Sequence, residues 1–229
     1  MKISAIFAAV LALAGAPAVH AVSVLDLGAY TLSYDDTTPG FGGLAYSFNG
    51  GGGSTGFGWS VQPSVLVSSG GAPAAASFAM PDFTVAVKPG WALSGPVTGS
   101  LGNLVFNEVL GATTSATASA MVSVDGGPSA PIGGPLSKVV TTSVPGFLSA
   151  GYYAGSITVP VGGFSSFSVS GGSLGLSAGG GTFSSVIGQT QNELKFSLIA
   201  TPVPEPETVA LLLAGLLTLG SLAYRRNRG

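Results

Sequence analysis

The sequence contains no cysteine, and its one histidine, His20, lies close to the N-terminus. Without cysteine there is no disulfide and no thiol nucleophile, so stability must come from burial and strand pairing. Residues 1–21 are predicted to be removed on export, which leaves the mature chain without histidine as well. Ser-His-Asp catalysis and histidine-based zinc sites are therefore excluded.

Charged residues are also scarce, at 7% of the chain. Residues 22–201 hold three lysines and seven acidic residues, which gives this segment a net charge of −4. Such a surface lacks the positive patch that nucleic acid requires, so we expect no nucleic-acid partner. The lysines are Lys88, Lys138 and Lys195, and the acids are Asp26, Asp35, Asp36, Asp82, Glu108, Asp125 and Glu193.

Glycine is abundant, but the pattern of the body is that of a folded domain. The 37 glycines and 15 prolines together stay just below the share, roughly 25–30%, that suggests disorder. Apolar and polar residues alternate with a period of two in many short runs, which is typical of strands with one buried face. The clearest runs are residues 82–88, 115–124 and 193–198, and others include residues 30–34, 46–48, 65–67, 104–106, 157–161 and 167–169.

Glycine and proline clusters separate these runs and predict turns. Many short strands joined by such turns predict an all-β body, an antiparallel β-sandwich or jelly-roll-like fold, over residues 22–201. Residues 125–135 hold two Gly-Gly pairs and three prolines, and we expect a long loop there.

Chemical motifs in the body are weak. Residues 52–56 and 171–175 both spell Gly-x-Ser-x-Gly, but neither precedes a predicted helix and no histidine is available to activate the serine. The acidic residues leave a carboxylate-pair glycosidase as one alternative, and Asp35 with Asp36 leave a structural calcium site as another. Turn roles for these acids are the simpler interpretation. We therefore expect no enzyme activity, no cofactor and no bound metal.

Large aromatic residues allow two interpretations. Trp59 and Trp91, with Tyr30, Tyr34, Tyr46, Tyr152 and Tyr153, are suited to stacking on sugar rings, or to filling the core of the sandwich. Core roles are the more common use of large aromatic side chains in such a domain.

The N-terminus has the pattern of a secretory signal peptide. Lys2 supplies a positive start, an apolar stretch follows, and small or apolar residues lead up to Ala21. This arrangement predicts export and cleavage by signal peptidase after Ala21.

The C-terminal segment, residues 202–229, has three parts. Prolines make residues 202–207 a stiff, extended strip. Residues 208–224 carry no charge and, as a helix of about 1.5 Å rise per residue, are at the short end of what crosses a bilayer. Arg225, Arg226 and Arg228 follow in the basic tail, residues 225–229. By the positive-inside rule this end stays in the cytoplasm and the body faces outward.

Val203, Pro204, Glu205 and Pro206, followed by an apolar span and an arginine cluster, resemble the PEP-CTERM sorting signal of Gram-negative bacteria. The resemblance implies processing near Pro-Glu-Pro by an exosortase, a membrane enzyme, in a host that makes exopolysaccharide or biofilm matrix. Glu207 departs from the small or hydroxyl residue that is more usual at its position.

Together these features predict a non-catalytic, exported protein. It is first anchored in the inner membrane with its body outside the cytoplasm, and then reaches the cell surface or the extracellular matrix after processing. The alternative function is a carbohydrate-binding or adhesive module with exopolysaccharide as its partner.

Overall fold

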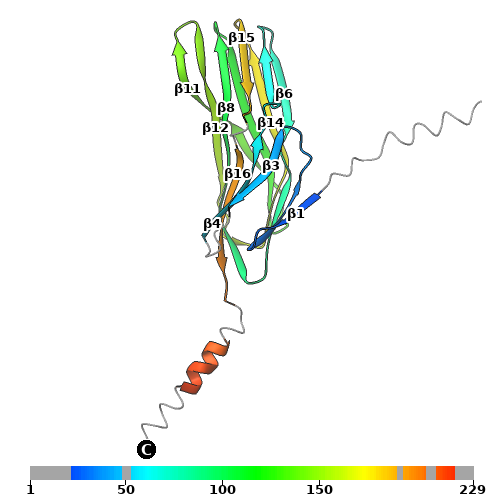
Figure 1. Cartoon of the computed structure of the whole chain (residues 1–229), viewed down its shortest axis with the longest axis vertical. Coiled ribbons are helices and arrows are strands. Elements are labelled where there is room, and N and C mark those ends of the chain that lie inside the picture. Colours follow the sequence, from blue (N-terminus) through cyan, green and yellow to red (C-terminus); the bar gives the residue numbers. More distant parts are fainter. Residues whose placement is uncertain (1–21, 48–52, 190–192, 205–209, 220–229) are drawn as a thin grey trace, which may run out of the picture.

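A computed structural model of the chain describes residues 22–47, 53–189, 193–204 and 210–219 (Figure 1). The predicted signal peptide with Ala21, the sorting residues Glu205 and Pro206, and the three arginines of the basic tail lie outside these ranges. The described body is all-β, as predicted, and its strands form two antiparallel sheets, here called sheet A and sheet B.

Sheet A has seven strands. Along the sheet they follow the order β1 (Val22–Asp26), β2 (Tyr30–Asp35), β7 (Phe83–Val87), β14 (Ser166–Gly179), β9 (Thr113–Val124) and β10 (Ala130–Pro135). The seventh strand, β6 (Ala74–Ala79), pairs with the C-terminal half of β14. Strands far apart in the chain therefore lie side by side, as with β7 and β14.

Sheet B has nine strands. The order is β11 (Ser137–Val144), β12 (Leu148–Val159), β8 (Trp91–Val109), β16 (Glu193–Pro202), β4 (Gly53–Val61) and β3 (Phe41–Ser47). β13 (Gly163–Phe164) and β15 (Phe183–Ile187) also pair with β8, and β5 (Leu66–Ser69) pairs with β15. β8 is the longest strand and pairs along its length with four others.

The core lies where the inward side chains of both sheets meet. Phe83 of sheet A packs edge-on against Phe57 and Phe196 of sheet B, at ring-centroid distances of 5.0 and 4.6 Å. Trp59 belongs to the same cluster and is only 2% exposed. The period-two alternation read from the sequence thus corresponds to real buried faces, because successive side chains of a strand point to opposite sides.

The prediction of a long loop over residues 125–135 is wrong. A short turn follows β9, and β10 then returns along it with Ile132 opposite Ala120. Two of the prolines, Pro131 and Pro135, are tolerated because β10 is the last strand of sheet A, where a missing backbone donor costs no ladder bond.

At the C-terminal end of the body, β16 runs out of the sandwich opposite the end that carries the β11–β12 hairpin (Figure 1). Residues 210–219 form a helix, while the rest of the predicted span 208–224 falls outside the described residues. Within the part of the chain that the structure describes, no helix has the length and apolar character needed to cross a membrane.

Candidate functional site

The junction between body and tail is built on β16, a central strand of sheet B. β16 pairs with β8 on one side and β4 on the other. Its inward residues Leu194, Leu198 and Ala200 are buried in the core. The body therefore holds the start of the tail through a fully paired strand.

The sheet bonds continue to the edge of the predicted sorting motif. Pro202 lies opposite Trp91, and the Val203 amide donates to the Gly90 carbonyl at 2.8 Å. Pro204 has no amide hydrogen to extend the ladder. Sheet pairing thus extends into the first two residues of the predicted strip, Pro202 and Val203, and ends before Pro204.

Most of the acidic residues serve local structure. Asp26 accepts hydrogen bonds from Lys88 and from the Gly28 amide, and these contacts lower the pKa of its carboxyl below the ordinary value. Asp125 accepts from the amides of Ser165 and Ser166 at 2.7 and 2.8 Å. Asp26 therefore stabilises its own turn, whereas Asp125 links the turn after β9 to the start of β14.

Asp35 and Asp36, the calcium candidate, also take part in local bonds. Asp35 accepts from the amide and hydroxyl of Thr37, and Asp36 accepts from the Ser23 hydroxyl. In the described ranges there is no group of three or more Asp, Glu, His or Cys residues placed to hold a metal ion. The geometry favours the turn interpretation for this pair.

Glu108 has a role that the sequence analysis did not identify. Its side chain is 7% exposed, and Oε1 accepts from the amide and hydroxyl of Thr114 and from Nζ of Lys138. The Tyr153 hydroxyl donates to the Thr114 carbonyl. Since Thr114 belongs to β9 and the other three to β8, β11 and β12, this cluster ties the two sheets together. The sequence did contain a signal for the burial of Glu108, because Leu104, Phe106 and Glu108 occupy alternate positions and so lie on the same face of the strand.

The aromatic residues divide between core and surface. Trp59 is buried among phenylalanines, and Tyr30 is fully buried with its hydroxyl 3.2 Å from that of Thr55. The core interpretation is confirmed for both, so neither is a sugar-stacking platform. Tyr46 and Tyr152 remain accessible to solvent, on β3 and β12.

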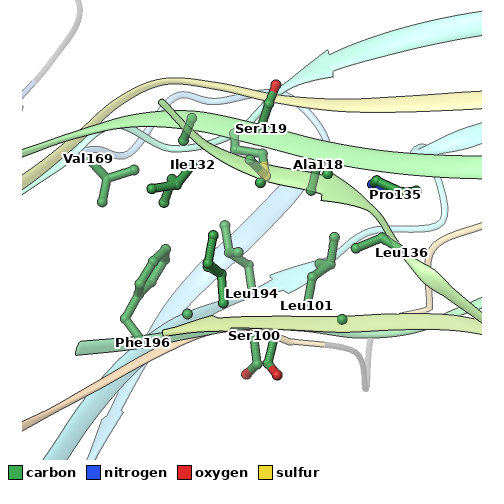
Figure 2. A pocket seen from close by; sticks show the side chains of 18 of the residues that line it. Ser100, Leu101, Ala118, Ser119, Ile132, Pro135, Leu136, Val169, Leu194 and Phe196 are labelled. Carbon is green, nitrogen blue, oxygen red and sulfur yellow. The ribbon is translucent and has the colours of Figure 1, made fainter. Parts of the chain in front are cut away.

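A space of about 330 Å³ lies between the sheets near the crossover from β10 to β11. Figure 2 shows Leu194, Phe196 and Leu101 pointing into it from one sheet and Ile132 and Val169 from the other. None of the described residues that line it is titratable. The lining of this space is largely apolar.

The C-terminal residues match a known sorting signal. The model of the PEP-CTERM protein-sorting motif matches residues 202–228, from the last residue of β16 through the basic tail. The chain is a PEP-CTERM domain-containing protein. The resemblance inferred from the sequence is therefore confirmed.

Comparison of the whole chain adds little to this motif. No curated protein matches the sequence. Among solved structures, TmCBM61 in complex with β-1,4-galactotriose is similar over 59% of this chain and 88% of that chain, at 10% identity and a TM-score of 0.21. A TM-score at this level supports no argument about ligand or function.

Proposed function

We propose that this PEP-CTERM protein is a non-catalytic component of the cell surface or extracellular matrix. The signal peptide exports it, the tail holds it at the inner membrane with its body outside the cytoplasm, and an exosortase-type enzyme then processes the tail. The observation that supports this most directly is the junction, where the last sheet bond, from Val203 to Gly90, lies directly before the residues Pro204, Glu205 and Pro206.

The junction also keeps the body close to the membrane before processing. Between Val203 and Ala210, the first residue of the described part of the helix, there are seven residue steps, which reach at most about 25 Å when fully extended. If the helix enters the bilayer, the strip lies within reach of an enzyme embedded there. The residues upstream of Pro204 are held in sheet B, so the cut is expected within the strip.

The absence of catalysis is supported by the chemistry of the body. Five of the seven carboxylates of the body take part in the hydrogen bonds described above, and the predicted mature chain has no cysteine or histidine. The carbohydrate-binding alternative needs a recognition surface, which the two buried aromatic residues, Trp59 and Tyr30, do not supply.

The test is the intact mass of the protein isolated from its producing cells. We expect a species that begins near Val22 and ends within the strip, and that loses this processing in a Glu205→Ala variant. Glu207→Ala is the matched control, since it removes a neighbouring carboxylate outside the Pro-Glu-Pro motif. A wild-type protein that retains Arg228 would contradict the proposal and leave a permanent anchor.

A further inference from the structure

The outer face of sheet B carries a polar hollow of about 430 Å³ across β11, β12 and β8. On β8, Leu104 and Phe106 point into the core, so Val105 and Asn107 point outward. On β12, Tyr153 is buried, so its neighbour Tyr152 faces outward. The hollow brings together side chains from four parts of the chain: Asn103, Asn107, Thr141, Tyr152 and Gln189.

A β-bulge shapes this face. Tyr153 lies opposite Leu104, but Gly155 lies opposite Leu101, so Gly102 and Asn103 together oppose the single residue Ala154. Asn103 adopts a left-handed backbone, with φ of 42°, and its side chain is exposed. Asparagine adopts this conformation more readily than most residues other than glycine, and bulges commonly redirect side chains beside binding sites.

A second hollow continues from the first. It measures about 620 Å³, shares Asn103 with the first, and includes Ser100, Ser156 and Lys195. In Figure 2 the Ser100 hydroxyl points away from the space between the sheets, and hence toward the outer face. The two hollows meet at the bulge and together follow β8.

The chemistry of this groove suits one class of ligand. Asn and Gln amides both donate and accept hydrogen bonds, as neighbouring sugar hydroxyls do, and a tyrosine ring offers an apolar face to the C–H side of a pyranose. Among the described lining residues of both hollows there is no carboxylate and a single lysine. A divalent cation would need more acidic ligands, and a nucleic acid would need more positive charge.

We propose that this outer groove binds a segment of polysaccharide. Tyr152 packs against a sugar ring, Asn107 and Gln189 bind hydroxyl groups, and the bulge at Asn103 holds the groove open between its two halves. Lys195 gives the far half a preference for sugars that carry a carboxylate. The proposal rests on the proposed function, because export places the body where such polymers are found.

The experiment measures binding of the protein, isolated from its producing cells, to exopolysaccharide from the same cells. The polymer is separated by anion exchange into a neutral and an acidic fraction, and each is titrated calorimetrically. We expect saturable binding, weakened about tenfold by Tyr152→Ala and several-fold by Asn107→Ala. Lys195→Gln should weaken binding of the acidic fraction and leave the neutral fraction unchanged.

Tyr46→Ala is the matched control, because Tyr46 is an exposed tyrosine on β3, away from the groove. Equal losses in Tyr46→Ala and Tyr152→Ala, or no saturable binding of either fraction by the wild type, would overturn the proposal. Thermal unfolding establishes that each variant is folded, and if Tyr152→Ala is not, Asn107→Ala decides the question.

Outcomes for this groove and for the sorting tail are separable. Normal processing without polysaccharide binding would contradict only the proposal for the groove. Polysaccharide binding by a protein whose tail is never processed would contradict the sorting proposal and support the groove as a binding site.

Discussion

The cross-sheet cluster around Glu108 predicts that Lys138→Met destabilises the body. The buried carboxylate accepts three hydrogen bonds, one of them from Lys138 at 2.5 Å, and the ammonium lies 4.6 Å from the centre of the Phe106 ring. Methionine keeps an unbranched chain over that ring but removes the positive charge. The carboxylate then stays buried with only the two donors of Thr114.

The size of the effect follows from burial. Removing one partner of a fully buried ion pair costs about 3–5 kcal/mol. The Lys138 side chain is 33% exposed, so water screens part of the interaction, and we expect a loss of about 2–3 kcal/mol. For a body of this size, that lowers the melting temperature by about 5–10 °C.

A double-mutant cycle with Glu108→Gln, followed by calorimetry or urea unfolding, isolates the pair from the other effects of each change. The double variant should lose less stability than the sum of the losses of the two single variants. Lys88→Met is the control, because its partner Asp26 lies at the surface and little change is expected. A loss of stability in Lys138→Met no larger than that in Lys88→Met, or a cycle without coupling, would contradict this role of the ion pair.

Three further predictions concern the core and the last strand. Trp59→Ala should lower the free energy of unfolding, measured in urea, by about 3–5 kcal/mol, because it removes a large side chain from the aromatic cluster. An unchanged free energy of unfolding would place Trp59 outside the core. Burial raises the pKa of Tyr30 despite its hydrogen bond with Thr55. The folded state therefore keeps a proton that the unfolded state loses near pH 10, so the free energy of unfolding should fall as the pH rises above about 10. This fall should be less steep in Tyr30→Phe, and equal slopes in the two proteins would exclude Tyr30 as its cause. A chain that ends at Gln191 lacks β16 and should show no cooperative unfolding, whereas one that ends at Pro204 should unfold cooperatively; equal protease resistance of the two would contradict the role of β16.

The sequence predicted the strands better than their arrangement. Alternation over residues 82–88 and 115–124 identified β7 and β9, because a buried face repeats with the pleat of the strand. The partners of those strands depend on long-range pairing, which has no local signal. β10 was missed since its glycines and prolines resemble a loop, and only its edge position makes them compatible with a strand. Gly133 in β10 leaves room for the carbonyl of Ala118, which a Cβ would strike.

The two candidate sites differ in the same way. The sorting motif is a continuous stretch, so its residues could be recognised in order from the sequence alone. The outer groove joins residues between Ser100 and Lys195 that meet only through strand pairing and a bulge. Tyr152 could be named as a candidate aromatic, but nothing local distinguishes it from Tyr153, which the register turns inward.

The place of β16 in sheet B has a consequence for the order of events during export. Residues 193–202 fill the gap between β8 and β4, yet they are the last part of the body to be synthesised and to leave the cytoplasm. In the export that we propose, the chain ahead of them would cross the membrane with sheet B split in two, and the sheet would close only once β16 has followed. A tail held at the membrane, as proposed, would give this strand time to insert, so the segment that sorts the protein would also delay its release until the body is complete.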